Sequence, residues 1–149
     1  MRTLRLLACA LPLTAFLAGC DERLSDLTGP TPNLQPSFAS IQREIFNVQD
    51  SSGRLACIQC HTNVGRTPSA GLNLAEGASY GALVGRPSAL KPGETFVIPG
   101  DPDNSYLVKK LAGAASIVGA RMPRSNGPFL TEGQMLVIRR WITAGAANN

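Results

Sequence analysis

The sequence is poor in aromatic residues, histidine and cysteine, and each shortage limits what the chain can be. Aromatic residues make up 5% of its 149 residues, so a large bound cofactor could supply part of the apolar core. The single histidine, His61, excludes any site that needs two imidazoles from this chain. The net charge of +4 comes from scattered lysines and arginines that form no basic stripe interleaved with aromatics, so we expect no binding to nucleic acid.

The first residues have the pattern of an export signal. Two arginines precede a mostly apolar run from Leu6 to Ala18, which is shorter than the roughly 20 residues of a membrane-spanning helix. The run ends in the letters LAGC, which resemble the lipobox of bacterial lipoproteins. We therefore predict a signal peptide over residues 1–19 and a lipid on Cys20, whose acyl chains would anchor the protein to a membrane. The alternative is an ordinary cleaved signal followed by an incidental cysteine.

Few cysteines are left for the exported part of the chain. Cys9 lies in the predicted signal and Cys20 would carry the lipid, so no disulfide framework is expected. Residues 20–36 contain three prolines and few large apolar side chains, which predicts a lipidated cysteine followed by a flexible tether. The domain is then predicted over residues 37–149, facing the periplasm or the cell exterior.

The predicted domain has the patterns of helices separated by loops. Apolar residues at helical spacing predict helices over residues 37–48, 76–84, about 103–111 and about 131–145. Thr131 and Gln134 have the spacing of a capping box at the start of the last helix. Residues 86–98 contain two prolines and a glycine and receive no role from the sequence. We therefore expect a domain made mostly of helix and loop.

The stretch Cys57-Ile58-Gln59-Cys60-His61 carries the clearest chemical signal. A C-x-x-C-H string is the signature of covalent haem attachment, because two cysteines three residues apart reach the edge of one porphyrin and the histidine can bind its iron. A zinc ion would need a fourth ligand, which only a carboxylate could supply here. A redox dithiol would be expected beside a βαβ pattern, and none is visible. An incidental cysteine pair is the third alternative.

A methionine is the strongest candidate for the second iron ligand. Its sulfur would close the iron and raise the reduction potential relative to a nitrogen ligand. Met135 has helical spacing with Ile138 and Ile142, which favours core packing. Met122 has no apolar periodicity around it, and the following Pro123 disfavours helix. We predict that Met122 is the distal ligand, with packing of a loop as the alternative.

Together these residues resemble class I c-type cytochromes, in particular small bacterial domains with one haem. The resemblance runs from about Phe38 to Ala147 and comprises CIQCH, GLNL, PGDPDNSYLVKKL, RMP and LTEGQMLVIRRWITAGA. It implies an all-α fold, a small cytochrome c-like helical domain wrapped around one covalently bound haem c. It also implies the roles of individual residues, namely thioethers at Cys57 and Cys60, proximal His61, distal Met122, and Trp141 packed near the haem and the crossing of the first and last helices.

The resemblance implies further contacts to the haem and its histidine. A proline carbonyl after the motif orients the histidine ring in many members, and Pro68 is the candidate here. Haem propionates would need cationic partners, for which the candidates are Arg66, Arg86, Arg121 and Arg124, with an ordinary surface position as the alternative for each.

The function that the resemblance implies is electron transfer rather than catalysis. The chain would carry one electron on a His/Met-ligated haem between unidentified donor and acceptor proteins. The alternative is a haem enzyme, or a sensor of gas or peroxide, in which Met122 leaves the iron. A third interpretation is a cytochrome subunit that stays docked to a dehydrogenase or oxidase.

Overall fold

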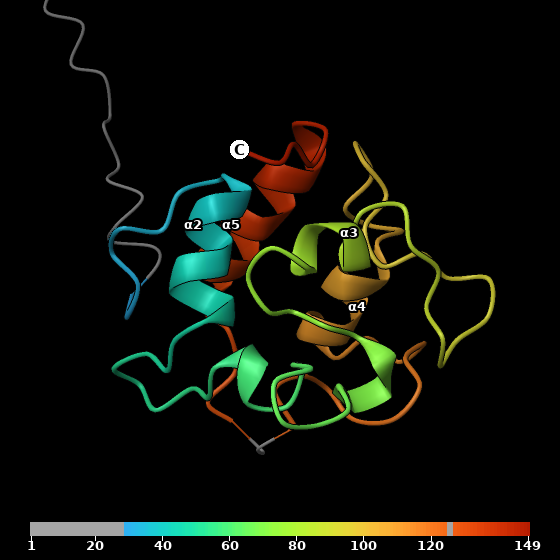
Figure 1. The fold of residues 1–149 in the computed structure, drawn as a ribbon. Coiled ribbons are helices and arrows are strands. Elements are labelled where there is room, and N and C mark those ends of the chain that lie inside the picture. The colour runs from blue at the N-terminus through green and yellow to red at the C-terminus, as the bar shows by residue number, and fades with distance from the viewer. Residues whose placement is uncertain (1–28, 125–126) are drawn as a thin grey trace, which may run out of the picture.

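The computed structural model describes residues 29–124 and 127–149, and the predicted signal peptide and Cys20 lie outside these residues (Figure 1). Among the described residues, the first element is a continuous helical segment and the last is the longest helix. In order, the elements are the α-helix α2 (Phe38–Ile41), the π-helix η1 (Gln42–Phe46), the 3-10 helices η2 (Cys57–Gln59) and η3 (Ser69–Gly71), and the α-helices α3 (Ser79–Leu83), α4 (Tyr106–Ala112) and α5 (Glu132–Thr143).

The prediction of an all-α, cytochrome c-like domain is wrong. In the described parts of the chain the α-helices have only 4, 5, 7 and 12 residues, and most other residues lie in turns, bends and isolated β-bridges. The apolar spacing that suggested helices extends over one or two turns only. Between the elements, glycines such as Gly85, Gly93 and Gly100 adopt positive φ angles that end regular structure. The body is therefore rich in loops, with short helices set among them.

The first and last helices pack against each other, as Figure 1 shows for α2 and α5. The predicted helix over 37–48 is present as α2 and η1, and its apolar stripe is buried. The ring of Phe38 in α2 lies 5.3 Å from that of Trp141 in α5. The chain end returns to the same place, because the backbone carbonyl of Asn149 accepts a 2.7 Å hydrogen bond from the Ala39 N–H.

The start of α5 forms as the sequence predicts. The Thr131 hydroxyl accepts a hydrogen bond from the Gln134 backbone N–H, and the Gln134 side chain accepts one from the Thr131 N–H. This reciprocal pair satisfies two backbone donors at the helix start that would otherwise lack partners. The predicted capping box is confirmed.

The last residues of the predicted tether belong to the packed body. Leu34 is fully buried and Thr31 is 3% exposed. The Gln134 side-chain amide donates a 2.9 Å hydrogen bond to the Thr31 hydroxyl. Packing against α5 therefore begins at about residue 31, before the predicted domain boundary at residue 37.

Residues 86–98 connect α3 to α4 and complete the start of α4. Their ends pair in isolated β-bridges, one of which joins Val84 and Val97. The carbonyls of Thr95 and Phe96 accept hydrogen bonds from the first backbone N–H groups of α4, each at 2.9 Å. These N–H groups have no partner within the helix. The segment for which the sequence indicates no role therefore caps α4.

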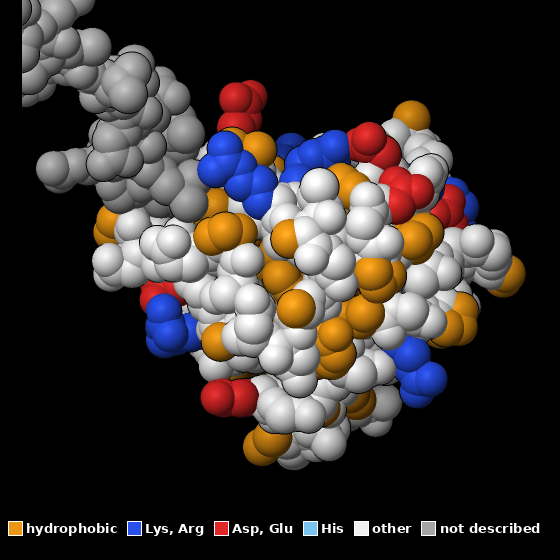
Figure 2. Space-filling model, turned by 90° about the horizontal axis from the view of Figure 1, so that it is seen from above, with side chains coloured by type: hydrophobic (Ala, Val, Ile, Leu, Met, Phe, Trp, Pro, Cys, Tyr) orange, Lys and Arg blue, Asp and Glu red, His pale blue; other side chains and the backbone are white. Residues whose placement is uncertain are grey.

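Charges of both signs are spread over the surface. On the face in Figure 2, the lysines, arginines and acidic residues lie toward the rim, and the centre carries uncharged and hydrophobic side chains. Among the helices that the structure describes, none combines the length and the hydropathy needed to cross a membrane.

Candidate functional site

The CIQCH motif forms a tight turn on the surface of the core. The backbone carbonyl of Cys57 accepts hydrogen bonds from the N–H groups of Cys60, at 3.2 Å, and His61, at 2.9 Å. Both cysteines are free thiols. Cys57 is half-buried and packs against the core, whereas Cys60 is exposed. The turn thus presents the two sulfurs in different environments, three residues apart on one chain segment.

The Cys57 thiol is poorly suited to redox exchange. Burial raises its pKa to about 11, against the opposing charge of Arg54. Its Sγ lies 3.6 Å from the Ile45 carbonyl, to which it donates. Because the thiolate is the reactive form of cysteine, a pKa this high leaves the group protonated at neutral pH. This environment does not favour the dithiol alternative.

The ring of His61 is held in one orientation by a backbone carbonyl. Its Nδ1 lies 3.2 Å from the Leu72 carbonyl oxygen, which can only accept a hydrogen bond. The bond therefore places the proton on Nδ1 and leaves the lone pair of the neutral ring on Nε2, the atom available to a metal. Burial lowers the pKa of His61, although the Leu72 carbonyl opposes the shift, so the neutral ring is favoured.

The carbonyl that holds His61 comes from the GLNL stretch, not from Pro68. The Pro68 carbonyl instead accepts a hydrogen bond from the Gly71 N–H at 3.0 Å, so the candidate from the sequence is wrong. The Leu74 N–H donates to the His61 carbonyl at 2.8 Å. Since the ring and the backbone of His61 are both bonded to residues 72–74, this short segment is the support of the histidine.

The supporting segment is itself fixed to the first helical segment. The buried side-chain amide of Gln42 in η1 donates a 3.0 Å hydrogen bond to the Leu74 carbonyl. The Ser79 hydroxyl at the start of α3 donates to the same Gln42 side chain. Gln42 therefore joins η1, α3 and the segment behind His61, a role that the sequence did not indicate.

A buried ion pair lies on the other side of the turn. The Arg54 side chain is fully buried, and its Nε donates to the Asp50 carboxylate at 2.9 Å. Its remaining nitrogens donate to the carbonyls of Glu44, Ile45 and Leu55. Arg54 thus fixes the end of η1 to the segment that leads into the CIQCH turn. The only sequence signal was a pair of opposite charges four residues apart around a serine-rich turn.

Met122 lies in a loop, half-buried and packed against the core. Its backbone N–H donates to the Lys110 carbonyl at 3.0 Å. The charge of Lys110 also lowers the pKa of His61, as the smallest contribution after the larger effect of burial. The loop of Met122 is therefore bonded to the last turn of α4. Met135 packs against the same core from α5.

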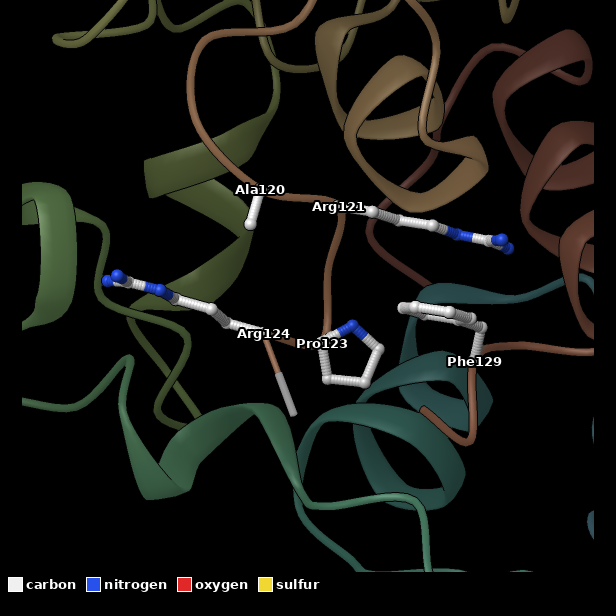
Figure 3. Close-up of a pocket in the computed structure, with 5 residues that line it drawn as sticks. All are labelled: Ala120, Arg121, Pro123, Arg124 and Phe129. Atoms are coloured by element: carbon white, nitrogen blue, oxygen red, sulfur yellow. The ribbon is translucent and has the colours of Figure 1, made fainter. Parts of the chain in front are cut away.

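A cavity of about 240 Å³ lies beside the Met122 loop (Figure 3). Its walls are formed by Ala120, Arg121, Pro123, Arg124 and Phe129. The Arg121 guanidinium lies over the Phe129 ring, and the Arg124 side chain extends in the opposite direction. The residues of the CIQCH turn are not part of these walls. The cavity is therefore next to the predicted distal ligand and separate from the predicted attachment turn.

The four arginines considered for propionates have different surroundings. Arg66 donates to the Gln59 carbonyl at 2.5 Å, directly over the CIQCH turn. Arg121 is bonded to the Leu111 carbonyl at 2.7 Å and stacked on Phe129. Arg124 borders the cavity and is exposed, as is Arg86. Of these, Arg66 lies close to the predicted attachment turn and Arg124 close to the predicted distal ligand. In the described residues, neither side chain stacks on an aromatic ring.

Trp141 is 1% exposed at the contact of the first and last helices. Its indole N–H donates to the Ala147 carbonyl at 2.8 Å. The ring packs on Phe38, which also contacts Phe46 and Tyr80 edge to face. Trp141 therefore packs where the first and last helices meet, as predicted. Its packing on a haem stays a prediction.

The donor set of these residues fits a covalently attached haem better than a metal ion alone. Within residues 29–124 and 127–149, no three histidine, cysteine or acidic side chains come together as they would around a bare ion. The chain offers instead two free thiols, one imidazole with Nε2 available, and one thioether in a fixed loop.

Comparisons with protein-family models, with curated proteins and with solved structures found no match.

Proposed function

We propose that this chain carries one haem c, attached through Cys57 and Cys60, and that it transfers single electrons outside the cytoplasm. The observation that supports this most directly is the hydrogen bond from His61 Nδ1 to the Leu72 carbonyl, which leaves Nε2 for iron. A histidine ligand is normally oriented by such a partner on its other ring nitrogen. In a C-x-x-C-H turn with free thiols, this geometry favours haem over the other interpretations of the motif.

When bound, a haem supplies the one-electron chemistry of its iron. The residues of this chain would hold it, exclude water and set its potential. His61 would hold it through a ring nitrogen, and the Met122 sulfur would supply the second ligand, which would favour the reduced state compared with a second nitrogen. A ligand pair of His61 and Met122 would leave no open iron position for a substrate, so we infer that the chain acts as a carrier for donor and acceptor proteins. Lipid anchoring through Cys20 is proposed from the sequence alone.

The test is the optical spectrum of the full chain produced together with a haem-attachment system. We expect covalently bound haem, a weak far-red sulfur-to-iron band in the oxidised protein, and no carbon monoxide binding after reduction. Met122→Ala should abolish the band and admit carbon monoxide. Met135→Ala, which removes the other methionine that packs on the core, is the matched control and should keep the band.

Two results would contradict the proposal. A chain that leaves the attachment system without covalent haem would refute the cofactor. A haem-loaded wild type that lacks the band and binds carbon monoxide would show an open iron, which would favour the enzyme or sensor of gas or peroxide instead.

A further inference from the structure

The loop that leads to Met122 is fastened to the end of α4 by a lysine. Lys110, in the last turn of α4, donates from Nζ to the carbonyls of Val118, at 3.0 Å, and Ala120, at 2.6 Å. A cation at this position is also favoured by the negative end of the helix dipole. The two bonds hold the loop down just before it reaches Met122.

An arginine holds the same loop from its other side. Arg121 Nε donates to the Leu111 carbonyl at 2.7 Å, and its guanidinium carbon lies 4.0 Å from the centre of the Phe129 ring. Gly113 makes this approach possible, because it ends α4 with a φ of 74° and a Cβ there would lie 2.8 Å from Arg121 Cδ. The side chain of Arg121 is thus bonded to α4 and stacked on the chain that precedes α5 (Figure 3).

The bonds of Lys110 and Arg121 converge on Met122. The Met122 N–H donates to the Lys110 carbonyl at 3.0 Å, directly next to the Arg121 bond to Leu111. Three consecutive loop positions, 120 to 122, are therefore bonded to Lys110 and Leu111 in the last turn of α4. A helix end leaves its final carbonyls without internal partners, and here the loop supplies those donors.

We propose that Lys110 and Arg121 are positioning residues that hold the Met122 thioether in place as an iron ligand. This inference rests on the proposed function. The bond of a methionine to iron can be displaced by an outside ligand whenever the loop swings away. Two cationic side chains that fasten the backbone just before Met122 to α4 oppose that swing and would keep the iron closed.

The test compares variants of the haem-loaded full chain that remove each contact. Lys110→Gln and Arg121→Gln should bind added imidazole on the order of tenfold more tightly than wild type, since losing about 1.4 kcal/mol of loop restraint corresponds to that factor. Arg121→Lys, which keeps a donor for the Leu111 carbonyl, should restore part of the difference. Lys109→Gln is the matched control, because the Lys109 side chain pairs with Glu94 at 2.8 Å instead of bonding to residues 118–122.

A second readout needs no haem. In the haem-free chain treated with hydrogen peroxide, Met122 should form sulfoxide faster in Lys110→Gln and Arg121→Gln than in wild type. Met135 in the same chain is the internal reference, since a variant that simply unfolds would expose both methionines. Peptide mass spectrometry measures the two rates separately.

The outcomes separate this inference from the function on which it rests. A wild-type far-red band with tighter imidazole binding and selective Met122 oxidation in the variants supports the positioning role. A wild-type band with unchanged imidazole affinity in both variants overturns that role and leaves the carrier function standing. Absence of the band in wild type overturns the carrier function and, with it, the role of Lys110 and Arg121 toward iron.

Discussion

At the scale of single residues, Arg54 shows how this chain builds its entry into the CIQCH turn. Hiding a guanidinium from water costs several kcal/mol unless a charge and hydrogen bonds replace the solvent. Asp50 provides the charge, and three backbone carbonyls provide the bonds. Asp50 is bonded in turn by Ser52. The turn after η1 is therefore held by a network of hydrogen bonds and an ion pair, and losing one member should disrupt the others.

Replacing Asp50 by asparagine should destabilise the chain strongly. The change leaves the Arg54 charge buried without its anionic partner, which typically costs about 3 kcal/mol or more. Urea unfolding at neutral pH, followed by circular dichroism, measures the loss. Asp103→Asn is the matched control, because Asp103 pairs with Arg139 on the surface with a side chain that is 79% exposed. Equal free energies of unfolding for the two variants would contradict the account.

The same carboxylate gives the stability a defined dependence on pH. Burial raises the pKa of Asp50, but the Ser52 hydroxyl and the Arg54 charge outweigh burial and hold it below its ordinary value of 3.8. An unfolded chain then takes up this proton at a higher pH than the folded chain. The stabilisation is therefore present above about pH 4 and is lost as the pH falls through the folded pKa. Wild type should lose more free energy of unfolding over this range than Asp50→Asn does.

At the scale of elements, the longest helix depends on how it starts. Thr131→Ala removes the side-chain half of the capping box and should cost about 1 kcal/mol. Thr143→Ala, at the exposed end of the same helix, makes the same chemical change without a cap and should leave stability within the error of the measurement. Chemical denaturation of both variants decides the matter, and equal midpoints would show that the cap contributes nothing.

Each of the four predicted helices has a counterpart in the structure, and the two with a cap and an apolar stripe keep most of their predicted length. The segment over 38–46 and α5 have both signals locally, and both form. The prediction of the overall fold class was wrong because one or two apolar helical turns cannot show how much loop lies between them. The prediction of the residue that supports His61 was also wrong, because the bond to Leu72 depends on how the eleven residues after His61 fold back to the ring. Backbone contacts of that kind leave no mark in residue type.

The candidate site shows the same division between local and distant information. The roles predicted for the cysteines and the histidine follow from their spacing in the sequence. Met122 is predicted as a ligand because no apolar pattern surrounds it. Arg54 and Gln42 were missed because their partners are backbone carbonyls and side chains that only the fold brings near. The loops of this chain therefore carry the residues of the candidate site, and the helices provide the surfaces to which the loops are bonded.

At the scale of the whole molecule, Trp141 would report on folding and on the proposed haem together. It is the single tryptophan of the chain and lies where α5 meets α2. A nearby haem would absorb its emission, so the folded haem-loaded chain should fluoresce several-fold more weakly than the folded haem-free chain. Since Trp141 contacts both helices, its emission should recover in urea at the midpoint at which helical circular dichroism is lost.

Fluorescence and circular dichroism recorded on the same samples test this prediction, with Trp141→Phe to measure the emission of the two tyrosines. Coincident transitions would show that the helix contact and the haem surroundings open as one unit, which is expected if the loops that hold His61 and Met122 depend on the same core. Equal emission from the haem-loaded and haem-free folded chains would place the haem far from Trp141. Emission that recovers before the helices are lost would mean that the cofactor loops open independently of the core.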